Sequence, residues 1–210
     1  MIVAIDGPAG AGKSTVARRL AERLGFRYLD TGAMYRGLTW LALERGVESE
    51  QGLALAELAR AHPVGFDAAG SVFIDGVDVT AEIRAVRVER AVPLVAAHPQ
   101  VREVMRSRQR ELVAEGDVVA EGRDIGTVVA PEADVKVYLL ADPQVRASRR
   151  GAERPEVGAD ALASDLRLRD ERDEERMQPA ADAQTIDTTH LSIDQVIAKI
   201  EALVRSRQGT

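Results

Sequence analysis

Residues 2–15 read Ile2-Val3-Ala4-Ile5-Asp6-Gly7-Pro8-Ala9-Gly10-Ala11-Gly12-Lys13-Ser14-Thr15, and no other segment limits the fold as strongly. Positions 7–14 match the pattern G-x-x-x-x-G-K-[ST], whose glycines let backbone N–H groups curl around a phosphate chain. An apolar run precedes this loop, and residues 14–24 follow it with helical spacing that ends at Gly25. Since a helix N-terminus carries partial positive charge, this succession of strand, loop and helix predicts a nucleotide phosphate site.

Two side chains of this loop have specific roles in the pattern. Lys13 can reach the β- and γ-phosphates, and the Ser14 hydroxyl can ligate Mg²⁺. Of the 28 basic residues only Lys13, Lys136 and Lys199 are lysines, so the loop keeps lysine where the chain otherwise prefers arginine. We therefore expect ATP to bind through residues 7–15, with Lys13 acting in catalysis and Ser14 holding the metal.

The composition is typical of a folded protein without nucleic-acid or membrane partners. The chain has 210 residues, 45% of them hydrophobic and 30% charged, which suits one domain with a substantial core. Its net charge of -6 argues against wholesale binding to nucleic acid or to an anionic membrane. The lack of cysteine excludes disulfides and thiolate metal sites. Because the first apolar run begins at Ile2, a secretion signal has no room, and we expect a cytoplasmic monomer.

Apolar runs alternate with helical patterns along most of the chain. Strands are predicted at 26–30, 117–121, 135–140 and 184–187, and helices at 33–45, 52–61, 160–176 and 192–205. Residues 80–115 are also helical in pattern, with breaks near Pro93 and at His98-Pro99, and Asp142-Pro143 starts a further helix. This alternation predicts an α/β fold of the P-loop NTPase type, a parallel sheet covered by helices on both faces.

Residues 64–79 do not follow this alternation of strands and helices. Short β runs at 64–66, 71–74 and 77–79 are separated by turn sequences, which predicts a small antiparallel meander. We expect one domain with a core at about 1–62 and 117–210, a β-containing insertion at about 63–100 and a lid at about 146–160. The charge-rich residues 150–158 are predicted to form a loop.

The arginines that follow later strands indicate a second phosphorylated substrate. Joining two phosphorylated anions requires cations on both sides of the transferred group, and the planar fork of arginine binds phosphate oxygens in pairs. A monophosphate has its second pKa at about 6, so it is already a dianionic nucleophile at neutral pH and needs no general base. A GTPase switch would need an N/T-K-x-D segment, which neither Lys136 nor Lys199 provides.

Five segments, in order, resemble bacterial cytidylate kinases. They are residues 5–15, Asp30-Thr31-Gly32-Ala33-Met34-Tyr35-Arg36, Glu121-Gly122-Arg123-Asp124-Ile125-Gly126-Thr127, Arg169-Asp170 with Asp173 and Arg176, and Ile186-Asp187-Thr188-Thr189 followed by Leu191-Ser192-Ile193. The resemblance covers nearly the whole chain, and its second and third segments are far more specific than the phosphate loop. It implies a kinase that transfers the γ-phosphate of ATP to CMP or dCMP with Mg²⁺, and a monophosphate-binding insertion like the meander.

The resemblance also implies roles for residues that bind the acceptor. Thr31 and Arg36 would hold the acceptor phosphate, with Tyr35 beside them. Arg123 would bind this phosphate between donor and acceptor and would act in catalysis. Arg102 and Asp124 would read the edge of the cytosine, whose N4 amine donates and whose O2 and N3 accept.

Further implied roles belong to two helical segments. Arg169, Asp173 and Arg176 share one helix face at spacings i, i+4 and i+7. By the resemblance, Arg169 and Asp173 would contact the sugar, and Arg176 would stand near the phosphates. Arg146, Arg149 and Arg150 would belong to a lid that closes over the γ-phosphate and excludes water, and Arg149 and Arg150 would act in catalysis.

Several alternatives stay open at the level of the sequence. Arg169 and Asp173 could form an ordinary surface ion pair, and Arg102 fits a solvated helix face equally well. Glu121 fits either water-mediated support of Mg²⁺ or a structural role. At Pro93 the chain lacks the serine that the resembled family commonly has there, and a proline offers no hydroxyl to the base. The nearest alternative function is a P-loop kinase for adenylate, a deoxynucleotide or shikimate, and the next is a nucleotide-dependent switch.

Overall fold

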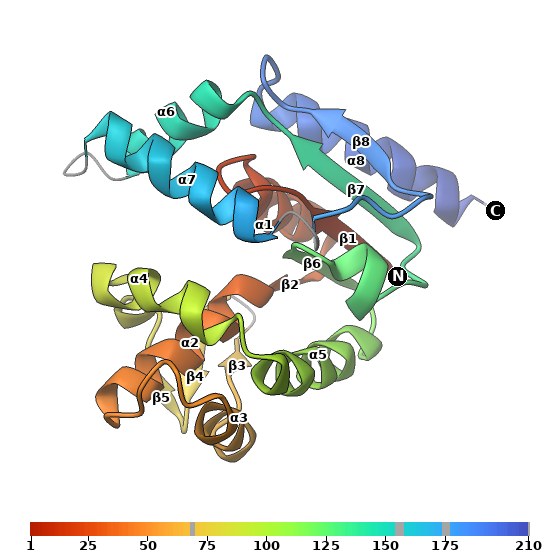
Figure 1. Cartoon of the computed structure of the whole chain (residues 1–210). Helices are drawn as coiled ribbons and strands as arrows, with labels where there is room; N and C mark the ends of the chain where they lie inside the picture. The colour runs from red at the N-terminus through yellow and green to blue at the C-terminus, as the bar shows by residue number, and fades with distance from the viewer. Residues whose placement is uncertain (68–69, 154–157, 174–176, 210) are drawn as a thin grey trace. The chain divides into compact units, whose positions relative to one another are not determined.

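The computed structural model describes residues 1–67, 70–153, 158–173 and 177–209. Two compact units make up the chain (Figure 1): Met1–Arg27 with Gly116–Thr210, and Tyr28–Glu115. Within the described ranges, no helix is both long and apolar enough to cross a membrane.

The first unit is built on a parallel sheet. Its strands are β1 (Ile2–Asp6), β6 (Val118–Gly122), β7 (Val135–Leu140) and β8 (Gln184–Asp187), and the sheet order is β2-β6-β1-β7-β8, where β2 spans Arg27–Asp30. The central strand β1 pairs with β6 from Ile2 opposite Val118, and with β7 from Val3 opposite Val135. The carboxyl ends of parallel strands lie at one edge of a sheet. The segments that follow β1, β6, β7 and β8 therefore all begin at that edge.

Helices flank this sheet. They are α1 (Lys13–Leu24), α6 (Pro143–Glu153), α7 (Ala159–Asp173) and α8 (Ile193–Gln208), with a short π-helix, η2 (Ile125–Val129), after β6. α1 packs against β6 and α8, while α6 and α7 lie side by side (Figure 1). The core of β1 is fully buried from Val3 to Ile5, as an apolar run in a covered sheet requires. The predicted α/β fold with a helix-flanked parallel sheet is confirmed.

The second unit holds the meander and several helices. Its elements are α2 (Thr31–Glu44), α3 (Gly52–Ala61), β3 (Gly65–Phe66), β4 (Val72–Ile74), β5 (Val77–Asp78), the 3-10 helix η1 (Glu82–Arg84), α4 (Val86–Val95) and α5 (Pro99–Ala114). The three strands pair antiparallel in the order β3-β4-β5, which confirms the meander. Asp75 and Gly76 join β4 to β5 with φ of 51° and 79°, the positive values that a tight hairpin turn needs.

Two predicted boundaries are wrong. α4 continues through Pro93 and ends at Val95. A proline inside a helix removes one hydrogen bond and its ring crowds the carbonyl four residues earlier, so the packing of α4 on α2 must offset that cost. α6 extends to Glu153 in place of the predicted loop, because Arg150, Ala152 and Glu153 are good helix formers and outweigh Gly151 between them. The rest of that stretch, residues 154–157 with Pro155, lies outside the described residues.

Other boundaries agree with the sequence or differ slightly. The predicted break at His98-Pro99 is confirmed, and α5 begins at Pro99, where a proline's missing N–H costs nothing. α2 begins at Thr31, two residues before the predicted start, because the side chain of Asp30 accepts the Ala33 amide and caps the helix. The boundaries of the insertion and of the lid stay predictions.

Candidate active site

The predicted phosphate loop joins the end of β1 to the start of α1. Its backbone has positive φ at Gly7 (143°), Gly10 (77°) and Gly12 (91°). A Cβ at Gly7 would lie 2.2 Å from the carbonyl oxygen of Leu139, so no side chain fits there. Such glycine conformations turn successive N–H groups inward, which is the geometry of an anion-binding loop.

Lys13 and Ser14 occupy the first turn of α1. The Lys13 side chain is buried, and its Nζ donates to the carbonyl oxygen of Pro8 at 2.9 Å. The ammonium therefore folds back over the loop that precedes it. Ser14 and Thr15, in contrast, are exposed at the helix N-terminus, where an anion is favoured.

The Ser14 hydroxyl suits a Mg²⁺ ion that arrives with a nucleotide. Mg²⁺ in such sites takes one or two protein groups, and phosphate oxygens and waters fill the remaining positions. Among the residues that the structure describes, no group of three or more histidine, cysteine or acidic side chains could hold a metal by itself. An exposed hydroxyl beside the loop thus fits a substrate-borne Mg²⁺.

Asp6, the last residue of β1, ties the loop to the segment after β6. Its carboxylate accepts the backbone N–H groups of Ile125 at 2.8 Å and of Gly126 at 2.7 Å. Burial raises the pKa of Asp6, while these two N–H groups and the charge of Lys13 act in the opposite direction. No separate role was predicted for Asp6, although a carboxylate at the end of an apolar strand is a signal for one.

Arg123 lies in this same segment and contacts both the loop and α7. Its NH1 donates to the carbonyl oxygen of Gly7 at 2.7 Å, and its Nε lies 3.3 Å from Oδ2 of Asp173. Two predicted acceptor-binding residues are thereby brought together. Asp124 follows Arg123 directly and precedes η2, and its backbone carbonyl accepts the N–H of Val128 at 2.9 Å.

Helix α6 packs directly on the phosphate loop. A Cβ at Gly10 would lie 3.0 Å from both Cβ and the carbonyl oxygen of Arg146. The buried Arg146 side chain donates to Ala9 O at 3.2 Å and to Oδ2 of Asp170 at 2.6 Å. Asp170, on α7, had no predicted role, and its link to the loop through Arg146 could not be found from sequence spacing.

Arg149, one turn further along α6, reaches the segment after β8. Its NH1 donates to Oγ1 of Thr188 at 3.0 Å, and its NH2 donates to Thr188 O at 2.7 Å. Arg150 lies beside it in α6 and is partly exposed. Lys13, Arg123, Arg149 and Arg150, the residues predicted to act in catalysis, thus all belong to the first unit.

The second unit carries four predicted acceptor residues, Thr31, Tyr35, Arg36 and Arg102. Oδ2 of Asp30 accepts from NH2 of Arg36 at 2.7 Å, while its Oδ1 accepts the Ala33 amide at 2.9 Å. Thr31 is buried at the start of α2, and Tyr35 lies on the same helix. Asp30 therefore both caps α2 and orients Arg36, a role that its place before Thr31 did not reveal.

Three predicted residues are placed less fully. Arg102 lies on α5, half-buried, with its backbone N–H bonded to His98 O at 3.1 Å. Arg169 belongs to α7, but its side chain lies outside the described residues, as does the whole of Arg176. Their predicted roles stay predictions.

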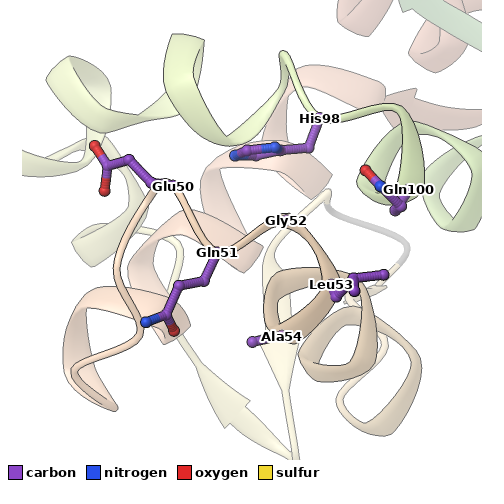
Figure 2. Close-up of a pocket in the computed structure, with 7 residues that line it drawn as sticks. All are labelled: Glu50, Gln51, Gly52, Leu53, Ala54, His98 and Gln100. Carbon is purple, nitrogen blue, oxygen red and sulfur yellow. The ribbon is translucent and has the colours of Figure 1, made fainter.

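A shallow hollow of about 460 Å³ lies elsewhere in the second unit, at the start of α3 (Figure 2). Its lining residues are Glu50, Gln51, Gly52, Leu53, Ala54, His98 and Gln100. The imidazole of His98 packs against Gly52, where a Cβ would lie 2.6 Å from Nδ1, and Nε2 of His98 lies 2.7 Å from Ser49 O. None of the predicted site residues lines this hollow.

The parallel sheet and the loop between β1 and α1 define a protein with the P-loop fold. Similar solved structures include a shikimate kinase from Acinetobacter baumannii in complex with shikimate (19% identity, TM-score 0.50, 98% of this chain and 93% of that one) and a gluconokinase from Sinorhizobium meliloti 1021 (15% identity, TM-score 0.50, 99% and 93%). At this identity they show the fold alone.

Sequence relatives are more specific. A family model described as cytidylate kinase matches residues 3–206. A cytidylate kinase of Shouchella clausii (strain KSM-K16) is 47% identical over 98% of this chain and 97% of its own length, and one of Rhodococcus opacus (strain B4) is 47% identical over 100% and 96%. The chain belongs to the cytidylate kinase family.

Proposed function

We propose that this chain transfers the γ-phosphoryl group of ATP to CMP or dCMP, giving ADP and CDP or dCDP. The observation that carries this proposal is the family match, whose range of residues 3–206 includes every predicted site residue. An enzyme of this kind would serve pyrimidine nucleotide metabolism. That it acts in the cytoplasm and as a monomer remains our expectation.

The donor half of the proposed reaction rests on the loop between β1 and α1. Its inward N–H groups and the N-terminus of α1 would bind the phosphates of ATP, and Lys13 would exchange Pro8 O for a phosphate oxygen. Ser14 would hold Mg²⁺, which supplies charge neutralisation between the β- and γ-phosphates when bound. This arrangement requires no acidic cluster from the protein.

The acceptor half of the proposal rests on the chemistry of the predicted acceptor residues. Arg36, oriented by Asp30, and Thr31 with Tyr35 would bind the acceptor phosphate, and Arg123 would offset the charge between the two phosphates. Asp124 and Arg102 would recognise the base, because a carboxylate and a guanidinium complement the donor and acceptors of cytosine. Asp173, with Arg169, would bind the sugar.

Charge on the transferred group would be met by arginines of α6. A phosphoryl group in transit spreads negative charge over its oxygens, and fixed cations lower the energy of that state. Arg149 and Arg150 would supply these cations, with Arg176 nearby. Closure over the γ-phosphate would also keep water from hydrolysing ATP.

An acceptor panel tests the proposed activity. ADP release is measured with ATP, Mg²⁺ and each of CMP, dCMP, UMP, AMP and shikimate. We expect kcat/KM for CMP and dCMP to exceed that for AMP by at least about tenfold, because the polar groups that pair with cytosine would be left unpaired by adenine. Equal turnover of AMP, or ATP hydrolysis that no acceptor accelerates, would contradict the proposal.

A matched pair of lysine variants controls the panel. Lys13→Met should lower kcat with CMP by at least about 100-fold, since a cation that meets developing charge is lost. Lys199→Met removes an exposed lysine of α8 and should leave kcat within about twofold. A similar loss of kcat in both variants would mean that the activity depends on the total positive charge of the chain and not on Lys13 in particular.

A further inference from the structure

Thr188 lies directly after β8 and is 2% exposed. Its backbone N–H donates to Leu140 O at 2.8 Å. Its Oγ1 lies 2.9 Å from Leu140 O and 3.2 Å from the carbonyl oxygen of Ala11 in the phosphate loop. Both its Oγ1 and its carbonyl oxygen accept from Arg149. One buried residue thus joins the end of β7, the phosphate loop and α6.

The chemistry of these groups fixes the direction of each hydrogen bond. A guanidinium only donates, so Oγ1 of Thr188 must accept from NH1 of Arg149. The single hydroxyl proton is then left for a carbonyl, that of Leu140 or that of Ala11. Every polar atom of Thr188 is engaged, and removal of its hydroxyl would leave a donor of a charged group without its partner.

The two bonds from Arg149 also fix the plane of its guanidinium. NH1 bonds to Oγ1 and NH2 to the carbonyl oxygen of the same residue, so the fork cannot rotate without losing one of them. In this orientation NH1 lies 4.0 Å from the position that a Cβ on Gly12 would occupy. The guanidinium therefore stands beside the last glycine of the phosphate loop, the residue that caps α1.

We propose that Thr188 is a positioning residue for phosphoryl transfer, which holds the Arg149 guanidinium beside the phosphate loop through its hydroxyl. This inference rests on the proposed function, in which Arg149 meets the charge of the transferred group. It states that the Thr188 hydroxyl affects kcat only by positioning the Arg149 guanidinium. A threonine that merely anchored the end of β8 would affect folding instead.

The test removes the hydroxyl and keeps the shape. Thr188→Val retains the β-branched side chain and the backbone bond to Leu140, while Thr188→Ser retains the hydroxyl. We expect Thr188→Val to lower kcat about tenfold and to leave the KM for CMP within about twofold. The misplaced Arg149 guanidinium would no longer stabilise the transition state, but it takes no part in binding CMP. Thr188→Ser should recover kcat to within about threefold of the wild type.

A double-mutant cycle separates positioning from anchoring. In an Arg149→Ala background, Thr188→Val should change kcat by less than about twofold, because the residue through which it acts is gone. A tenfold loss in that background as well, or a fall in melting temperature with kcat unchanged, would overturn the inference. Thr188→Ala serves as a second hydroxyl-free variant if valine impairs folding.

The two proposals fail in different ways. If the wild type shows no CMP-dependent ADP release, the proposed function is wrong. If the wild type phosphorylates CMP and Thr188→Val is equally active, the function stands and the role of Thr188 is wrong.

Discussion

Asp6 shows how one buried side chain can carry both structure and pH dependence. Its carboxylate is desolvated at the end of β1, which raises its pKa, yet it accepts two backbone N–H groups that hold the start of η2. A carboxyl whose pKa is raised on folding binds more protons in the folded state than in the unfolded one. Its contribution to the free energy of unfolding is therefore fully present below the unfolded pKa and is lost as pH rises.

The variant Asp6→Asn should expose this dependence. Urea denaturation of both proteins is measured at several pH values upward from about 4, near the ordinary aspartate pKa. The free energy of unfolding of the variant, minus that of the wild type, should increase with pH, by about 1.4 kcal/mol for each unit by which folding raises the pKa. A difference that stays constant or falls with pH would show that burial does not dominate at this carboxyl.

The positions of residues that lie in one contiguous motif could be predicted from the sequence. Contacts between residues far apart in the chain could not. Lys13, Ser14 and the loop glycines follow from their own spacing, because strand, loop and helix are contiguous. Asp6 with Ile125, and Thr188 with Arg149, meet only after the strands of the sheet are ordered. No spacing in the sequence encodes those pairings.

At the scale of elements, α8 is specified by its own first turn. Ser192 and Gln195 form a capping box, in which the Ser192 hydroxyl accepts the Gln195 amide and the Gln195 side chain accepts the Ser192 amide. The sequence predicted a helix from Ser192 to about Arg205 on its amphipathic spacing, and the capping box explains why the helix begins there. α4 is specified less locally. It contains Pro93, where propensity alone predicts a break, and its packing against α2 stabilises the helix through that residue.

The cap of α8 can be tested with two serines of the same region. Ser192→Ala should lower the free energy of unfolding by about 1 kcal/mol, since an amide at the helix start loses its partner. Ser206→Ala, in the last turn of α8, is the matched control and should change it by less than about 0.5 kcal/mol. Chemical denaturation measures both, and an equal loss in the two variants would mean that the cap adds nothing specific.

At the scale of the whole molecule, the chain is negatively charged overall but holds positive side chains at the proposed phosphate sites. The chain carries a net charge of -6, yet it is proposed to bind two phosphorylated anions. The cations that would do so are held by named partners: Lys13 by Pro8 O, Arg36 by Asp30 and Arg149 by Thr188. Because these cations are already placed by the fold, a nucleotide that binds any of them, such as an acceptor at Arg36, should stabilise the folded chain.

Ligand-dependent melting measures that stabilisation without any catalysis. CMP at about 100 times its Kd should add about 2.7 kcal/mol to the free energy of unfolding, or about 5–10 °C in melting temperature for a chain of this size. AMP and cytidine at the same concentration should give smaller shifts, since one lacks the cytosine and the other the phosphate. Arg36→Gln should roughly halve the shift by CMP, because loss of a charged hydrogen bond weakens binding about tenfold. Arg60→Gln, an exposed arginine of α3, should leave the shift unchanged, and a full CMP shift in Arg36→Gln would remove Arg36 from the acceptor site.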